Sequence, residues 1–320
     1  MYRATSPQSR PSAGSPPRAL SGRWTPSARL APLVRLASWS LSVFLRLVLT
    51  VGLGSLVLAS AGCGARPGQP APGAGGRSLT VAGSTSVQPF AELLANEFMT
   101  THPDIAVSVQ GGGSSAGARA ALTGVAQIGM LSRELKAEEQ SLRPVVIARD
   151  AIAVIVHPSN PIDDLTTSQI RDIFAGRVTN WSQVGGPNHR IDVVSREEGS
   201  GTRGSFDEIV MGESEVTPAA VVQDSNGAVR ETVAGDPAAV GYISLGLVDS
   251  RVKGVRVSGV APSVSNVENG TYRIVRPFIF ATRGAPSPYV QEFIDFALSS
   301  TGQKLLESEG LVPVSANNRP

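Results

Sequence analysis

Residues 191–210 read IDVVSREEGSGTRGSFDEIV, and this stretch indicates the fold class. Ile191–Val194 is a β-branched, apolar run of the kind that forms a buried strand. The segment GSGT at 199–202 then ends the strand, and a helix is expected from there to Val210. The unit is a strand, a turn of glycine and hydroxyl residues, and a helix.

The same unit occurs twice nearer the N-terminus. A strand at 79–81 precedes the turn GSTS at 83–86, and apolar residues then recur at helical spacing as far as His102. A strand at 105–109 precedes GGGSS at 111–115, which opens a second helix. Alternating strands and helices predict an α/β fold with mixed, mainly parallel sheets. Ligands of such folds bind at the carboxyl ends of the strands, where these turns are expected to gather.

The alternation continues along the rest of the chain. Further strands are predicted at 126–130, 145–148, 151–156, 240–243 and 274–280, and helices at 169–174 and 291–306. The first of these strands leads into Leu131-Ser132-Arg133, a third loop with a hydroxyl and a cation.

The three glycine-hydroxyl turns share a chemistry that suits an oxyanion. The start of a helix presents unpaired N–H groups and a partial positive charge. Glycine lets the backbone approach a ligand, and hydroxyls add neutral donors. A single serine before a helix is most often only a cap. Three such turns, one of them carrying Arg196, predict an anion-binding site.

The N-terminal 62 residues have a different composition. They hold seven arginines and no lysine, aspartate or glutamate, and an apolar segment follows Arg46. This is the pattern of a secretory signal, and the ending LASAGC at 58–63 resembles a lipobox with Cys63 as the lipidated residue. A membrane-spanning anchor or a plain signal is the alternative, since the uncharged stretch is just long enough to span. Either places the body outside the cytoplasm, behind a glycine- and proline-rich tether over 63–77.

Composition excludes several classes of protein. The chain has 320 residues, of which 41% are hydrophobic, so it can form one large or two ordinary domains. Without the leader, 21 of the 28 basic residues remain against 26 acidic ones, a net charge of about −5, which argues against a nucleic-acid partner. One cysteine rules out an internal disulfide, and no metal-binding pattern or cofactor motif is present.

Five segments together resemble the phosphate-binding protein of the high-affinity phosphate ABC transporter, in its short bacterial lipoprotein form. They are AGSTSVQP at 82–89, GGSSAG at 112–117, GMLSR at 129–133, DAIAV at 150–154 and REEGSGTR at 196–203. The resemblance spans about 78–315. It implies a type II periplasmic-binding-protein fold, with lobe one at 78–153 plus 278–320 and lobe two at 154–277. The two crossover strands are expected near 153–157 and 273–279.

The resemblance also implies which residues hold the phosphate. The family's binding loops correspond to Ser84, Thr85, Ser86, Ser114, Ser115, Arg196, Ser200, Gly201 and Thr202. It implies further that the protein delivers phosphate to permease subunits in the membrane. We expect a monomer without cofactor or metal.

Four more residues are candidates for the same site. Arg196 would make a paired contact to two phosphate oxygens, with Glu198 fixing its guanidinium. Ser132 would add a hydroxyl, and Arg133 would touch the ligand or neutralise Asp150. Longer relatives carry an aspartate at the third loop that accepts the proton of phosphate. Arg133 stands at that place here, so Asp150 is the candidate acceptor.

Other functions remain open on the sequence alone. The segment GSSAG at 113–117 fits the G-x-S-x-G pattern of serine hydrolases, with Ser115 as nucleophile. None of His102, His157 and His189 stands in a convincing triad context. Another oxyanion, such as sulfate, molybdate or phosphonate, is a second alternative, and a sensor or adhesion module a third. A kinase is disfavoured because no Walker-type motif occurs.

Overall fold

The structure is a computed structural model, and it describes residues 77–314, which belong to one compact unit. The predicted leader and the lipidation site at Cys63 lie outside the described residues. The helices are α2 (Gln88–Thr101), α3 (Ser114–Thr123), α4 (Thr167–Phe174), α5 (Gly201–Phe206), α6 (Asn226–Gly235), α7 (Val264–Glu268), α8 (Pro288–Leu298) and α9 (Ser300–Ser308). Shorter helical turns are η1 (Ala137–Glu139), η2 (Trp181–Val184), η3 (Asp207–Met211) and η4 (Leu245–Leu247). Between 77 and 314, no helix combines the length and the apolarity needed to cross a membrane.

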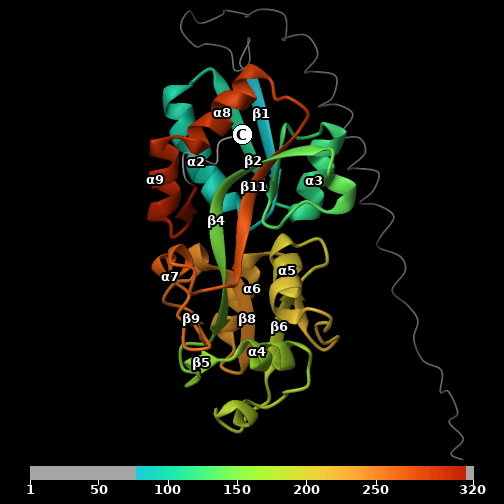
Figure 1. Cartoon of the computed structure of the whole chain (residues 1–320), viewed down its shortest axis with the longest axis vertical. Coiled ribbons are helices and arrows are strands. Elements are labelled where there is room, and N and C mark those ends of the chain that lie inside the picture. The colour runs from blue at the N-terminus through green and yellow to red at the C-terminus, as the bar shows by residue number, and fades with distance from the viewer. Residues whose placement is uncertain (1–76, 315–320) are drawn as a thin grey trace, which may run out of the picture. The chain divides into compact units, whose positions relative to one another are not determined.

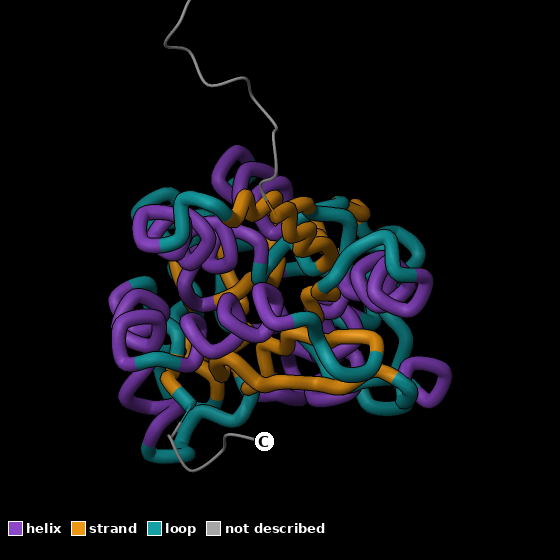
Figure 2. The backbone as a smooth tube through the Cα atoms, turned by 90° about the horizontal axis from the view of Figure 1, so that it is seen from above, coloured by secondary structure: helices purple, strands orange, loops and turns teal. Residues whose placement is uncertain are grey.

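Strands of two sheets alternate with these helices. They are β1 (Arg77–Gly83), β2 (Ile105–Gln110), β3 (Ile128–Leu131), β4 (Leu142–Val156), β5 (Asp164–Leu165), β6 (Asp192–Arg196), β7 (Val221–Gln223), β8 (Ala239–Ser244), β9 (Lys253–Gly254), β10 (Arg256–Val257), β11 (Val275–Arg283) and β12 (Val312–Pro313). The larger sheet has the order β2-β1-β3-β11-β4-β8-β6-β7, and β5 pairs with β10 separately. Helices lie around the strands when the chain is viewed from above (Figure 2).

The sheet has two parallel halves joined by antiparallel strands. In one half β2, β1 and β3 are parallel, and in the other β8, β6 and β7 are parallel. Between them, β11 is antiparallel to β3 and β4, and β4 is antiparallel to β8. The predicted class is thus confirmed: an α/β fold with mixed sheets, mainly parallel within each lobe, and two crossover strands (Figure 1).

The two long strands β4 and β11 run side by side from one lobe into the other (Figure 1). The first part of β4 pairs with β11 as far as Ala151, and the part from Ile152 onward pairs with β8. The limits of lobe one at 78–153 plus 278–320, and of lobe two at 154–277, remain a proposal. The change of partner at Ile152 supports it.

Each lobe buries apolar side chains on both faces of its sheet. In β11, Phe278 and Phe280 pack among the side chains of α2, α8 and α9, whereas Ile279 and Ala281 pack toward α3. This alternation follows from the period of two in a strand. It fixes the register of β11, because a slip of one residue would exchange the two faces.

Three helices begin where the two lobes face each other, α2 and α3 in one parallel half of the sheet and α5 in the other. α2 follows β1, α3 follows β2 and α5 follows β6, and in each case the glycine-hydroxyl turn lies between strand and helix. One helix prediction was wrong. The expected closing helix at 291–306 is two helices, α8 and α9, separated at Ser299, whose hydroxyl caps α9 by accepting from the N–H of Gly302.

Candidate functional site

Five buried hydroxyls from four loops lie in mutual contact and form what we call the hydroxyl cluster. It consists of Ser84, Ser86, Ser114, Ser132 and Thr202, none of which is more than 2% exposed. Ser84 Oγ lies 2.9 Å from both Ser86 Oγ and Ser132 Oγ. Ser114 Oγ lies 3.3 Å from Ser132 Oγ, and Thr202 Oγ1 lies 3.4 Å from Ser86 Oγ. The cluster therefore joins all three predicted turns and the third loop.

Glycines allow these loops to approach so closely. Gly83 has φ of 140°, and a Cβ there would lie 2.4 Å from the carbonyl oxygen of Met130. At Gly201 a Cβ would lie 2.1 Å from Ser114 Oγ and 2.5 Å from Ser132 Oγ. The start of α5 thus packs directly against the serines of the other lobe, which a side chain would prevent.

The two lobes are in contact across the cluster. The N–H of Ser115 donates to the carbonyl of Gly199 at 3.1 Å, and Ser205 Oγ donates to the carbonyl of Ser132 at 3.2 Å. Ser200 caps α5, because its hydroxyl accepts from the N–H of Arg203. The arrangement is a closed one in which groups from both lobes meet at the hydroxyls.

Arg196 lies beside the cluster at the end of β6, and it is 1% exposed. Its Nη2 donates to Thr85 Oγ1 at 3.2 Å and to the carbonyl of Asp224 at 3.1 Å. Its Nε donates to the carbonyl of Gln223 at 3.1 Å. Within the described chain its Nη1 is buried and has no hydrogen-bond partner. An unpaired buried donor on a cation is costly, and an anion would satisfy it.

The carboxylate that holds Arg196 is Glu197, not Glu198 as the sequence predicted. Glu197 accepts from Nε at 2.9 Å through Oε2 and from Nη2 at 3.0 Å through Oε1. Residues two apart share a side only while a strand continues, and β6 ends at Arg196. The chain then turns, and Glu198 is exposed at a pocket between the lobes.

Asp150 lies in the crossover strand β4 and is not in contact with the cluster hydroxyls. Its Oδ2 accepts from Arg276 Nε at 3.0 Å, and its Oδ1 accepts from Ser244 Oγ at 2.8 Å. Complete burial raises the pKa of the Asp150 carboxyl, while Arg276 and Ser244 oppose that rise. The prediction that Arg133 could neutralise Asp150 is wrong. The partner of Asp150 is Arg276, which stands directly across from it in β11.

Arg133 is engaged elsewhere. Its guanidinium makes a paired contact with Glu139, Nη1 to Oε2 at 2.6 Å and Nη2 to Oε1 at 2.8 Å. Nη2 also donates to Ser115 Oγ at 3.2 Å. Arg133 is 5% exposed and reaches Ser115, outside the hydroxyl cluster. A positively charged donor cannot act as a general base, so this contact does not resemble a hydrolase site.

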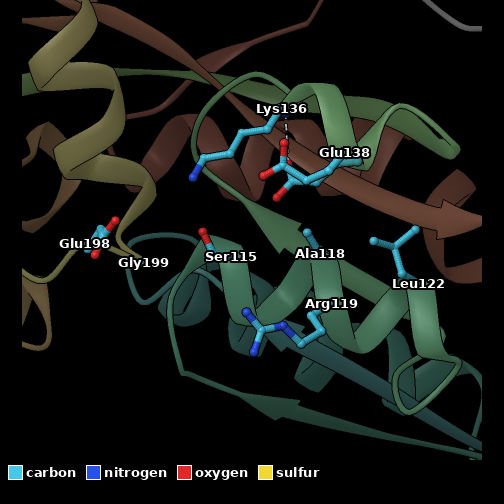
Figure 3. Close-up of a pocket in the computed structure, with 9 residues that line it drawn as sticks. Ser115, Ala118, Arg119, Leu122, Lys136, Glu138, Glu198 and Gly199 are labelled. Atoms are coloured by element: carbon cyan, nitrogen blue, oxygen red, sulfur yellow. Dashed lines mark hydrogen bonds between the residues drawn. The ribbon is translucent and has the colours of Figure 1, made fainter.

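A pocket of about 440 Å³ opens next to Ser115, where the lobes meet (Figure 3). Lobe one contributes α3 and η1, and Glu198 and Gly199 lie on the opposite side (Figure 3). Arg119 and Lys136 bring positive charge to it, and Glu138 negative charge. The pocket is adjacent to the hydroxyl cluster but does not contain it.

The sequence reasoning missed four residues that the structure brings to this region. They are Glu139, Glu197, Ser244 and Arg276. Arg276 had a signal, because it is the charged residue within the apolar run at 274–280. A charge inside a buried strand needs a buried partner. Among residues 77–314, no group of three or more His, Cys, Asp or Glu side chains is placed to hold a metal ion.

Comparison with known proteins places the chain among related sequences and structures. A family model described as a PBP superfamily domain matches residues 68–301. The phosphate-binding protein PstS of Bacillus subtilis (strain 168) is 31% identical over 246 residues, which cover 74% of this chain and 81% of that protein. PstS of Borreliella burgdorferi is 29% identical over 250 residues, covering 74% of this chain and 90% of that protein.

Solved structures agree with the sequence relatives. A candidate phosphate ABC transporter substrate-binding protein from Clostridium perfringens, solved with bound phosphate, is 43% identical with a TM-score of 0.73. It aligns with 75% of this chain and 100% of its own. An ABC-type phosphate transport receptor from Vibrio cholerae is 38% identical with a TM-score of 0.63, over 74% of this chain and 100% of its own.

Proposed function

We propose that this chain, which belongs to the PBP superfamily and within it to the family of PstS phosphate-binding proteins, captures inorganic phosphate between its lobes. It then delivers the phosphate to the permease of an ABC transporter. The relatives named phosphate-binding proteins cover three quarters of the chain, which supports this assignment. The body acts as a binding protein and carries out no reaction on its ligand.

The observation that carries the proposal is the hydroxyl cluster beside Nη1 of Arg196, which has no hydrogen-bond partner among residues 77–314. The cluster sits where three helices begin, so backbone N–H groups add to the hydroxyl donors. Each hydrogen bond to a charged group contributes about 1.5–3 kcal/mol when buried. Several such bonds in a closed site can bind a small anion without a metal.

The residues proposed to contact phosphate come from both lobes. They are Ser84, Thr85, Ser86, Ser114, Ser132, Arg196, Ser200, Gly201 and Thr202. Ser115 and Glu198 line the pocket next to the hydroxyl cluster, and Arg133 positions Ser115. Asp150 holds Arg276 in place and is not proposed as a ligand contact.

The proposal extends to the location and the partners. The mature protein works outside the cytoplasm, in the periplasm or on the cell surface. Lipidation of Cys63 anchors it to the membrane, and the segment 63–76 serves as a tether. It is proposed to act as a monomer, because closure of its own two lobes completes the site. Its proposed partners are permease subunits in the membrane.

Binding of phosphate can be tested by calorimetric titration and thermal unfolding of the full-length protein in detergent. A ligand at 100 times its Kd stabilises the folded state by about 2.7 kcal/mol. We expect a clear rise in Tm with excess phosphate, and no rise with chloride at equal ionic strength. Absence of both heat and stabilisation with phosphate would contradict the proposal.

A further inference from the structure

We propose that Gly204 in α5 and the side chain of Arg133 set how closely the two lobes approach each other, and that both are therefore positioning residues for the capture of phosphate. The inference rests on the proposed function, because capture requires the lobes to close over the ligand. Neither residue belongs to the hydroxyl cluster, and neither is proposed to touch the ligand. Their contact acts on the separation of the lobes and not on the anion.

The helix α5 turns a face of small residues toward lobe one. It lies at the end of lobe two that meets lobe one (Figure 1). Gly201, Gly204 and Ser205 are spaced at i, i+3 and i+4, which places them on one side of the helix. A Cβ at Gly201 would lie 2.5 Å from Ser132 Oγ, and Ser205 Oγ donates to the carbonyl of Ser132 at 3.2 Å. The backbone of α5 thus lies directly against the loop that follows β3.

The side chain of Arg133, on the lobe-one side of this contact, is held in place by hydrogen bonds. Its Nη1 donates to Glu139 Oε2 at 2.6 Å and to the carbonyl of Glu134 at 2.8 Å. Its Nη2 donates to Glu139 Oε1 at 2.8 Å and to Ser115 Oγ at 3.2 Å. The side chains of Arg133 and Glu139 are both buried, so water does not compete for these bonds. A guanidinium fixed at four points keeps its aliphatic stem from rotating away, and the stem forms a firm surface.

Gly204 is the point at which α5 meets this stem. A Cβ at Gly204 would lie 3.3 Å from Arg133 Cδ, slightly closer than an ordinary van der Waals contact. A free arginine could move aside by a few tenths of an ångström, but the guanidinium of Arg133 is paired with Glu139. The further carbons of a larger side chain would need space that the stem already occupies. Glycine at 204 therefore permits the observed approach of the lobes, and a larger residue should hold them apart.

The contact joins the two lobes, so a substitution at Gly204 should affect closure more than the fold of either lobe. Gly204 lies within α5 and does not have a positive φ, so any residue can adopt its backbone conformation. Alanine and leucine also have a higher helix propensity than glycine. A larger residue at 204 should therefore weaken phosphate binding while leaving the ligand-free protein at least as stable as wild type. A loss of affinity caused by misfolding would instead lower the Tm.

The decisive measurement is the phosphate Kd of the full-length protein in calorimetric titration, for wild type and for Gly204→Leu. Overpacking of this contact should raise the Kd about tenfold or more, with no loss of Tm in the absence of phosphate. Gly235→Leu is the matched control, because Gly235 is a helical glycine of the same lobe whose Cβ would have no atom within 4 Å. Its Kd should stay close to that of wild type. A rise well below tenfold for Gly204→Leu, or an equal rise for the control, overturns the inference.

A second test asks whether the loss of affinity depends on Arg133. The double variant Arg133→Ala with Glu139→Gln removes the stem and leaves no buried charge unpaired. Adding Gly204→Leu to this background should raise the Kd by less than about threefold, because the space that leucine needs is now free. The difference between the two backgrounds measures the coupling of the two positions. An equal rise in both backgrounds contradicts the inference.

Hydrogen exchange at the start of α3 reports closure directly. The N–H of Ser115 donates to the carbonyl of Gly199 across the lobes at 3.1 Å, so closure protects it. With saturating phosphate this amide should exchange about tenfold faster in Gly204→Leu than in wild type. Equal protection in the two proteins counts against the inference.

The outcomes separate this inference from the proposed function. A wild-type protein that binds no phosphate would refute the proposed function itself, whereas normal binding by a folded Gly204→Leu protein refutes only the role of Gly204. If Gly204→Leu does not fold, Gly204→Ala decides in its place. Its single added carbon should raise the Kd about threefold, and an unchanged or lower Kd overturns the inference.

Discussion

Replacement of Arg196 by alanine tests the proposed site most directly. The guanidinium is 1% exposed, its Nη1 has no partner within the described chain, and its other nitrogens are held by Glu197, Thr85 and backbone carbonyls. The unpartnered nitrogen is thus presented in a fixed geometry. Losing one member of a buried, charge-assisted contact costs about 2–5 kcal/mol. A loss of about 3 kcal/mol raises the phosphate Kd roughly 150-fold.

The assay is calorimetric titration with phosphate, preceded by thermal unfolding without ligand. Arg196→Ala also removes the side-chain donor to the backbone carbonyl of Asp224, so some loss of Tm is expected. Arg177→Ala is a matched control, because Arg177 is an exposed arginine of the same lobe that pairs with Asp172 at the surface. It should leave the Kd unchanged. A folded Arg196→Ala protein with wild-type affinity would show that the anion binds elsewhere.

Three further predictions follow from the packing. Gly201→Ala should weaken phosphate binding at least tenfold in a calorimetric titration, because its Cβ would lie 2.1 Å from a serine oxygen of the other lobe. The control Gly235→Ala, whose Cβ would have no atom within 4 Å, should bind phosphate normally in the same titration. Asp150→Asn should lower the free energy of unfolding in urea by about 3–5 kcal/mol, since it leaves a buried arginine without its counter-charge; an unchanged midpoint would show that the pair is dispensable. Burial alone would raise the pKa of Glu139, but Arg133 and the N–H of Lys136 hold it below its usual range. Its stabilising contribution is therefore present at neutral pH and lost as the pH falls through that lowered pKa, so Glu139→Gln should lose less Tm than wild type between pH 7 and pH 3.

The parts of the site that were predictable are local in sequence. A glycine-hydroxyl turn between a strand and a helix is visible within ten residues, so the turns before α2, α3 and α5 could be placed from the sequence. The rule that loops meet at the carboxyl ends of parallel strands explains why the turns after β1 and β2 lie together, and the turn after β6 reaches them because the other lobe faces them. For this reason the hydroxyl cluster contains residues from each predicted turn.

The ion pair between Asp150 and Arg276 could not be predicted because it depends on a strand pairing distant in sequence. Asp150 and Arg276 are 126 residues apart, and only the antiparallel register of β4 and β11 brings them together. The prediction of Glu198 in place of Glu197 as the partner of Arg196 was wrong for a different reason. It depended on the residue at which β6 ends, and the ends of elements are the least certain part of a sequence prediction. The break between α8 and α9 at Ser299 is of the same kind.

The continuity of β4 has a consequence for how the molecule unfolds. This single strand is hydrogen-bonded to β11 in one lobe and to β8 in the other, so neither sheet keeps all its strands if β4 is released. Unfolding of either lobe releases β4 and so removes a paired strand from the other lobe. The unfolding of the two lobes is therefore coupled. The body should therefore melt in one cooperative transition, with equal calorimetric and van't Hoff enthalpies, although each lobe has its own apolar core.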